Sequence, residues 1–402
     1  TDNPFITGTT YNFTRNGTDY VAVRKDRVMT IYKRTKTDKL KKVKKIKLEK
    51  FEYFGCFYPA PDGNYYFAYG YSNNKEKDKK VVIKVAKYNS NWKKVKTAKI
   101  LGKSTNMFKG IVKPFDWSNC SLALNGNVLY MHTARLMYTN KSDGLRHQSD
   151  ISFQINTKTM KVTNKSDTYA SHSFGQIALY KDNDLYLLDH GDGFPDGIKL
   201  TMVKNYRTPE EEHEQKVIFR LKNGSGASFR CLDAGKNHVL VLGTGKPLNY
   251  AVKKVKGYNN KYVDNLYLIT VDRKTNKQKF IWLTENNPKK SKTTIGDCAM
   301  LKITDDRFAI IYSTCNKNDN SGYTMKNYKT YYMVVDDSGK VIMKKKLKGI
   351  NYSGYSYPIL SNGYISWVER KDKTKRLYFY GFGFAPVTAS TYIKINKIPV
   401  EF

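Results

Sequence analysis

Short runs of alternating apolar and polar residues recur along this chain, and each run lies next to a tight-turn sequence. A turn of the Asn-Gly or Asp-Gly kind, followed by an aromatic or aliphatic strand, returns roughly every 58 residues. Such a turn needs positive φ, and between strand-forming residues it is the strongest local signal of a β-hairpin. The copies lie at 16–17, 62–63, 125–126, 182–183, 234–235, 305–306 and 362–363. Seven regularly spaced hairpins predict a repeat architecture.

The second half of each repeat has a signature of its own. An alternating strand leads through a polar turn to a basic strand, as in residues 81–88, 89–92 and 93–100. Two hairpins per repeat give four antiparallel strands, and seven such units predict an all-β, seven-bladed β-propeller. The blades are expected to begin near Thr18, Phe57, Cys120, Ser171, Ser228, Cys298 and Tyr357.

The ends of the chain bear on how such a ring would close. The last repeat is short of strands, and residues 9–14 are expected to supply its outer strand. Closure of this kind removes the exposed edge that an open array would carry. No Pro-rich, Gly/Ser-rich or structureless stretch separates two cores, so residues 1–402 are predicted to form a single propeller domain.

Some segments resemble known propellers. The turn at 336–340 is similar to the turn that joins the last two strands in pyrroloquinoline-quinone-type bacterial propellers. Over most of its length the chain also resembles secreted propeller proteins of Gram-positive bacteria with no assigned activity. The segments that carry this likeness are 131–133, 143–148, 171–174 and 188–192. The resemblance implies a secreted propeller, and it carries over no catalytic residue.

The charge of the chain is extreme. Lys and Arg number 71 against 35 Asp and Glu, which gives a formal net charge of +36. Lysines on exposed strand faces would block edge-to-edge pairing, but this excess is more than solubility requires and also favours attraction to a polyanion. No apolar run is long enough to span a membrane. The start at Thr1 and the Tyr/Asn/Lys/Thr-rich strands predict a secreted or surface-exposed protein.

The five cysteines form no metal-binding spacing. Cys56, Cys120, Cys231 and Cys298 each precede a turn by a few residues, which places them on the first strand of a repeat. They are therefore interpreted as small packing residues. The odd count argues against a full disulfide framework, and a pair between Cys298 and Cys315 stays open.

Four of the six histidines are expected on one face of the third and fourth blades. His132 and His190 are predicted to end second strands, while His147 and His172 are predicted to begin strands at the same face. Loops on a rigid scaffold often carry function. Candidate ligand-binding residues from the same loops are Arg135, Arg146, Asp189 and Asp192.

Three interpretations of this face stay open: inert caps at strand ends, a binding site, or catalysis in which His abstracts a proton while Arg neutralises an acid group. Zinc on His132, His147 and His190 is conceivable, but the spacing matches no known zinc motif, so no metal or cofactor is predicted. Trp92, Trp117 and Trp367 either stack on sugars or pack in the core.

The sequence favours a binding protein for an anionic polymer, such as a cell-wall or host glycan, held by Lys and Arg and by the histidine face. The alternative is a polysaccharide lyase that acts on an acidic glycan, so enzymatic activity is left open. A scaffold for protein partners is a third hypothesis. Nucleic acid would fit the charge, but no binding motif supports it.

Overall fold

The computed structural model describes residues 10–35, 40–103, 110–165, 168–191, 197–220, 227–245, 263–286, 293–317, 325–370, 377–383 and 398–400. Within these ranges the chain forms strands and turns and no α-helix, so no described helix could cross a membrane. Two compact units are present. One contains Ile46–Ser225, and the other contains Thr9–Lys45 and Gly226–Phe402.

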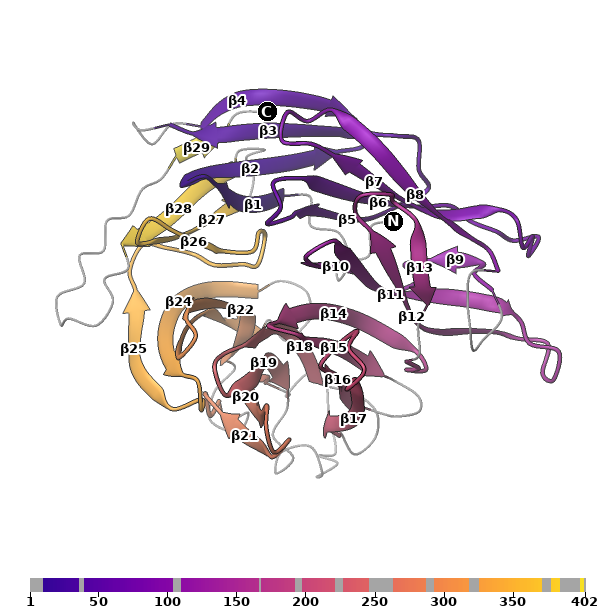
Figure 1. Cartoon of the computed structure of the whole chain (residues 1–402). Coiled ribbons are helices and arrows are strands. Elements are labelled where there is room, and N and C mark those ends of the chain that lie inside the picture. Colours follow the sequence, from indigo (N-terminus) through magenta and orange to yellow (C-terminus); the bar gives the residue numbers. More distant parts are fainter. Residues whose placement is uncertain are drawn as a thin grey trace. The chain divides into compact units, whose positions relative to one another are not determined.

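The first unit has three antiparallel sheets whose strands pair in chain order, with β9 added beside β11 (Figure 1). The strands of the first sheet are β5 (Tyr53–Pro59), β6 (Tyr65–Gly70), β7 (Val81–Tyr88) and β8 (Lys94–Leu101). Those of the second are β9 (Lys113–Pro114), β10 (Cys120–Asn125), β11 (Val128–Thr139), β12 (Arg146–Asn156) and β13 (Val162–Lys165). Those of the third are β14 (Ser173–Lys181), β15 (Asp184–Gly191), β16 (Gly197–Lys204) and β17 (Glu212–Phe219).

The second unit has four sheets of the same design. The N-terminal sheet contains β1 (Thr10–Arg15), β2 (Thr18–Lys25), β3 (Val28–Arg34) and β4 (Leu40–Lys47). Two further sheets contain β18 (Ala227–Ala234), β19 (His238–Gly245), β20 (Asn265–Asp272) and β21 (Gln278–Trp282), then β22 (Thr293–Thr304), β23 (Arg307–Lys317), β24 (Met325–Asp336) and β25 (Val341–Leu347). The last contains β26 (Ile359–Ser361), β27 (Tyr364–Arg370), β28 (Leu377–Gly383) and β29 (Ile398–Val400).

Four-stranded antiparallel sheets of this kind are the blades of a β-propeller, and the all-β fold class is confirmed. Six four-stranded sheets and one five-stranded sheet are present, but only six propeller blades are recognised, one fewer than predicted. The sheet β26–β29 has outer and inner strands of only three residues each. A closed ring of seven blades stays a prediction.

The predicted role of the N-terminal strand is wrong. Residues 10–15 form β1, which pairs with β2 in the first sheet, while β29 is the outer strand of the last sheet. The reason is local: Asn16 and Gly17 both have positive φ and form a tight turn that brings Arg15 opposite Thr18. Hairpin closure over two residues competes well with pairing to a distant strand.

Apolar side chains fill the interfaces between neighbouring sheets inside each unit. In the first unit, Ile83 of β7 and Met131 of β11 belong to one buried cluster. In the second, Leu268, Ile310 and Trp367 come from three different sheets and share another. Strand alternation therefore buries both faces of most inner strands.

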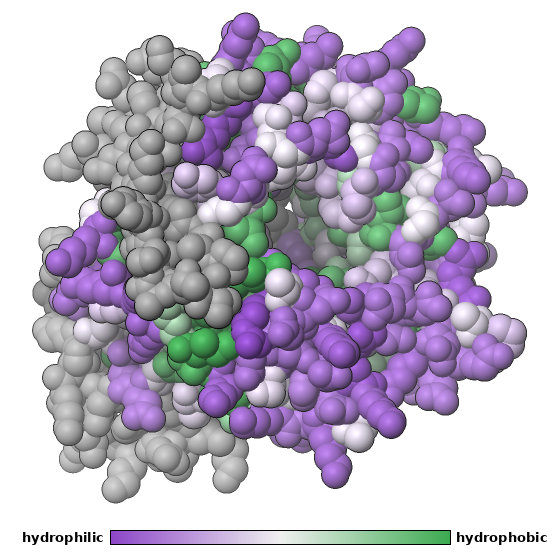
Figure 2. All heavy atoms as spheres, turned by 60° about the vertical axis from the view of Figure 1, so that its left-hand side comes forward, coloured by the Kyte–Doolittle hydropathy of each residue, from purple (hydrophilic) through white to green (hydrophobic). Residues whose placement is uncertain are grey.

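The outermost strands of several sheets are basic and exposed, and Figure 2 shows hydrophilic residues over most of the described surface in view. Strand β4 exposes lysines on nearly every position, and β8 and β25 follow the same pattern. The exposed lysines of these three strands are Lys41, Lys42, Lys44, Lys45, Lys47, Lys94, Lys96, Lys99, Lys344 and Lys346. Charged edge strands discourage pairing with another chain.

Candidate functional site

Sheet β9–β13 has one apolar face and one polar face, and both are buried. Residues 150–155 alternate polar and apolar, and all six are buried. Ile151 and Phe153 join the apolar cluster shared with sheet β5–β8. Asp150 and Ser152 point to the opposite side by strand alternation. The polar face packs against sheet β14–β17, as the contact between His132 of β11 and Asp189 of β15 shows.

A hydrogen-bonded chain crosses this polar interface. The His132 ring lies 2.7 Å from Ser152 Oγ through Nδ1 and 3.1 Å from Asp189 Oδ2 through Nε2. Ser173 Oγ donates to Asp189 Oδ1 over 3.0 Å. The order Ser–His–Asp is that of hydrolase triads, but Ser152, His132 and Asp189 are at most 1% exposed. A nucleophile must reach its substrate. We therefore assign a structural role to this hydrogen-bonded series of side chains.

A second buried carboxylate, Asp150, completes the network. It accepts hydrogen bonds from Thr168 Oγ1 at 2.8 Å and from the backbone N–H of Ala170 at 2.6 Å. One ligand atom each from His132, Asp150 and Asp189 lie within 4.8 Å of one another, a set that suits a metal ion. However, the positive charge of the buried Lys199 acts to lower the pKa of both Asp150 and His132. A cationic side chain therefore already lies close to these two groups.

The protonation of this network is sensitive to its burial. Burial raises the pKa of Asp150 to about 6, and the negative charge of Asp189 adds to the rise. Burial lowers the pKa of His132, but the charge and hydrogen bond of Asp189 together with the charge of Asp150 outweigh it, so the net direction is upward. Both groups therefore hold protons more tightly in the folded state than in the unfolded chain.

The other predicted histidines have different partners. His147 Nε2 lies 2.7 Å from Asp143 Oδ2, and His172 Nδ1 lies 3.2 Å from the hydroxyl of the preceding serine. The ring of His190 packs 6.2 Å from Phe174. Each of the four histidines therefore has a different set of partners. His132 and Asp189, which were expected on neighbouring blades, do contact each other.

The predicted arginines are also separated. Arg146 is exposed and pairs with Glu76 at 3.0 Å. Arg135 is buried, and its Nε has no hydrogen-bond partner among the described residues. Burial lowers the pKa of Arg135 to about 10, although the charge of Asp150 opposes this change. Asp192 lies outside the described residues.

An exposed tryptophan lies near the polar interface on the loop between β9 and β10. Trp117 is 65% exposed and has a φ of 50°. Gln148 Nε2 donates to the carbonyls of Asp116 and Ser173, at 2.9 and 2.6 Å, and the N–H of His172 donates to the Gln148 carbonyl at 2.9 Å. His172 is exposed and also has positive φ. Such strained backbone persists where the surroundings hold it, and it concentrates at functional sites.

The two other tryptophans named in the sequence pack instead. Trp367 is fully buried, and Trp92 stacks on Tyr65 with 3.6 Å between ring centroids. The sequence could not show that Trp117 is exposed while these two tryptophans are packed, because exposure depends on how the sheets and their connecting loops pack.

The second unit contains a cavity of about 600 Å³ at sheet β22–β25. Tyr312 and Tyr331 stack in its wall with 5.2 Å between centroids, and Lys344 Nζ lies 5.9 Å from the Tyr312 ring. Its remaining lining residues are Thr284, Glu285, Asn286, Thr293, Thr314, Asn316, Tyr328 and Lys329. No local sequence pattern signalled this cavity, since its residues come from four strands and from the segment after β21.

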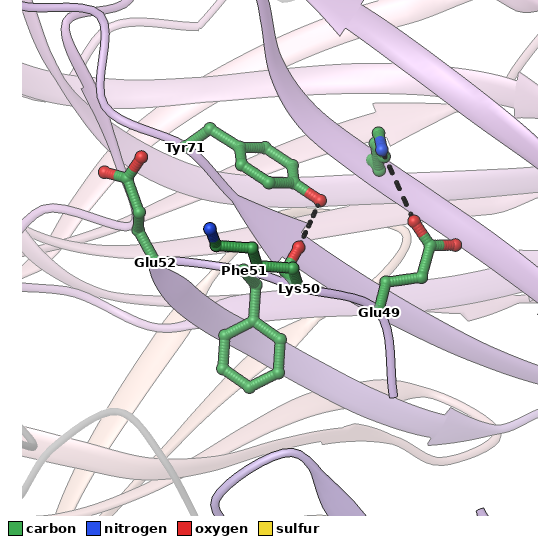
Figure 3. Close-up of a pocket in the computed structure, with 6 residues that line it drawn as sticks. Glu49, Lys50, Phe51, Glu52 and Tyr71 are labelled. Atoms are coloured by element: carbon green, nitrogen blue, oxygen red, sulfur yellow. Dashed lines mark hydrogen bonds and ion pairs between the residues drawn. The ribbon is translucent and has the colours of Figure 1, made fainter. Parts of the chain in front are cut away.

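A smaller cavity of about 390 Å³ lies in the first unit beside the segment 49–52. Figure 3 shows the Tyr71 hydroxyl turned toward the Lys50 carbonyl, to which it donates over 2.8 Å. Glu49 pairs with Lys84 at 3.4 Å and also with Lys94. The charged groups of this cavity neutralise one another, which leaves the cavity of the second unit as the better candidate for a charged ligand.

No protein-family model matches the chain, and no curated protein matches it. Solved structures share its fold. A periplasmic gluconolactonase of Pseudomonas aeruginosa has a TM-score of 0.50 at 11% identity, over 93% of this chain and 92% of that one. A lignostilbene dioxygenase of Pseudomonas brassicacearum has a TM-score of 0.46 at 9% identity, over 86% and 73% of the two chains. At such identities the likeness concerns the propeller fold alone.

Proposed function

We propose that this protein binds an anionic polysaccharide, such as a cell-wall or host glycan, outside the cell. The observation that carries the proposal is the cavity of about 600 Å³ in the second unit. Tyr312, Tyr328 and Tyr331 offer aromatic rings, while Lys329 and Lys344 offer positive charge. Aromatic surface with a few placed polar groups is typical of ligand sites, and this pairing suits a sugar ring that carries an acid group.

The rest of the lining supports a sugar more than a purely apolar ligand. Asn286 and Asn316 provide amide groups, and three threonines provide hydroxyls. Each of these groups both donates and accepts hydrogen bonds, as sugar hydroxyls do. Glu285 is the one carboxylate among the described lining residues, so the two lysines outweigh it.

The basic outer strands extend the attraction beyond the cavity. Lys346 and Lys348 are exposed on or just after β25, the strand that also carries Lys344. A field of one sign raises the association rate of an oppositely charged polymer and weakens as salt is added. Binding is therefore expected to fall steeply with ionic strength.

Charge removal in the cavity tests the proposal. The double variant Lys329→Ala/Lys344→Ala is expected to bind a uronic-acid polysaccharide about tenfold more weakly, because two charge contacts of modest strength are lost. Titration calorimetry at fixed salt measures the change. The matched control is Lys44→Ala/Lys45→Ala on β4, which removes the same charge elsewhere and is expected to change affinity much less.

The outcomes separate the competing functions. Equal losses in both double variants would mean attraction by net charge without a site. Absorbance of unsaturated sugars that grows with time would favour the lyase hypothesis. Absence of binding to acidic and neutral polysaccharides alike would overturn the proposal and favour a scaffold for protein partners.

Trp117 is proposed as a second sugar contact, on the face that the sequence singled out. Stacking of a sugar on an exposed indole is worth on the order of 1 kcal/mol, so Trp117→Ala is expected to weaken polysaccharide binding about fivefold. Leu145→Ala is the control, because Leu145 is also largely exposed. Unchanged affinity in Trp117→Ala would remove this face from the proposal.

A further inference from the structure

Two cysteine side chains meet at the apolar interface of the first unit. Cys56 of β5 and Cys120 of β10 belong to neighbouring sheets, and their Sγ atoms lie 3.5 Å apart. Cys120 is a buried member of the apolar cluster, and Cys56 is partly exposed and packs against that cluster. The sequence interpretation of both as packing residues placed them on the correct strands, but it did not reveal that they meet.

The pair that the sequence left open has a less favourable arrangement. Cys298 lies opposite Tyr312, and Cys315 lies opposite Thr294, so the two are offset along the hairpin β22–β23. All five cysteines are free thiols in the structure. Among them, Cys56 and Cys120 have the contact that suits cross-linking.

The geometry at Cys56 allows the sulfurs to approach. A disulfide needs its sulfurs at about 2.05 Å, so the two thiols must close by roughly 1.5 Å from their contact of 3.5 Å. The register of β5 against β6 shifts between Phe54 and Cys56, which marks a bulge. Bulged strands bend locally, and the bulge lies directly beside the thiol that must move.

We propose that Cys56 and Cys120 form a redox-sensitive cross-link that joins sheet β5–β8 to sheet β9–β13. The oxidant is a small-molecule disulfide such as oxidised glutathione. The Cys56 thiolate attacks one of its sulfurs, forms a mixed disulfide and releases one glutathione. Cys120 then loses its proton and attacks Cys56 Sγ, which releases the second glutathione. Two electrons pass to the oxidant, and two protons are released from the protein thiols.

The electrostatics predict how fast the two steps proceed. Burial, and then the neighbouring Cys56, raise the pKa of Cys120 well above its usual value. Its thiolate is therefore scarce at neutral pH, and the second step is expected to limit the rate. Cross-linking should accelerate as the pH rises from 7 to 9.

The cross-link has a stability consequence. The two cysteines are 64 positions apart in the sequence, so the disulfide would close a long loop in the unfolded chain. Longer loops lose more conformational entropy on cross-linking. The oxidised protein is expected to melt a few degrees above the reduced protein.

The test is oxidation of the intact, folded chain with oxidised glutathione, followed by thiol counting and peptide mapping without reductant. We expect two of the five thiols to disappear and one cross-linked peptide pair to contain Cys56 and Cys120. Cys120→Ser should instead retain glutathione on Cys56, and Cys315→Ser, the matched control, should cross-link like the wild type.

Three outcomes would overturn the proposal. Five unreacted thiols would show that the pair is inaccessible, and glutathione retained on the wild-type protein would show that the sulfurs cannot meet. A cross-linked protein that melts no higher than the reduced form would refute the stabilising role. None of these readouts depends on polysaccharide binding, so this inference and the proposed function fail separately.

Discussion

Asp189→Ala is expected to lower the free energy of unfolding by about 3–5 kcal/mol, since removing one member of a buried charged network leaves the others uncompensated. His132 would lose its partner at Nε2, and Ser173 would lose its acceptor. Lys199, which lies opposite Asp189 on β16 and is also buried, would keep its positive charge without that carboxylate beside it. Urea unfolding followed by tryptophan fluorescence measures the change.

Two further variants give this experiment its meaning. Asp189→Asn keeps an oxygen that can accept from His132 or Ser173 but removes the charge, so a smaller loss is expected. Asp182→Asn removes a carboxylate that is 62% exposed on the turn before β15, at a left-handed position that Asn also adopts, and a change within about 0.5 kcal/mol is expected. If Asp189→Asn and Asp189→Ala both behave like Asp182→Asn, the buried network does not stabilise the fold.

Glu369→Gln is expected to remove a large pH dependence of stability from the second unit. Glu369 is buried on β27 and accepts hydrogen bonds from the N–H and the hydroxyl of Ser353. Burial raises its pKa from 4.5 to about 7, and the charge of Asp297 adds to the rise. Because the folded state binds this proton more tightly, the stability that Glu369 contributes is present below pH 4.5 and is lost as the pH rises through 7.

The size of the effect follows from the shift in pKa. A difference of roughly 2.5 units corresponds to about 3 kcal/mol. The unfolding free energy of Glu369→Gln relative to wild type should therefore rise by up to this amount between pH 4.5 and pH 8. Glu212→Gln, at an exposed position on β17, is the control and should track the wild type. A constant difference between Glu369→Gln and wild type across this range would show that Glu369 ionises freely in the fold.

The strands could be predicted because their signals are local. Turns such as 125–126 are flanked by residues that fit a pleated sheet, and Asn125 indeed lies opposite Val128 in the hairpin. The same locality explains the error at the N-terminus. The turn at 16–17 already provides β1 with a partner, whereas the prediction gave residues 9–14 a partner more than 300 residues away.

The candidate site was harder to predict because burial is not a local property. The alternation in 150–155 is equally consistent with a polar face in water and with a polar face against a second sheet. The sequence therefore placed His132 and Asp189 on neighbouring blades but could not foresee that they would be enclosed. The contact between Cys56 and Cys120 depends in the same way on how two sheets pack, which no pattern within either strand reports.

The polar interface between sheets β9–β13 and β14–β17 restricts how a chain built from repeats can change. Where two sheets meet through apolar side chains, one repeat can replace another at the cost of repacking. At this interface a replaced sheet must supply partners for His132, Asp150 and Asp189 in their present positions. These two sheets should therefore be inherited as a pair, and recombination or duplication of repeats should be tolerated more readily at the apolar boundaries than at this one.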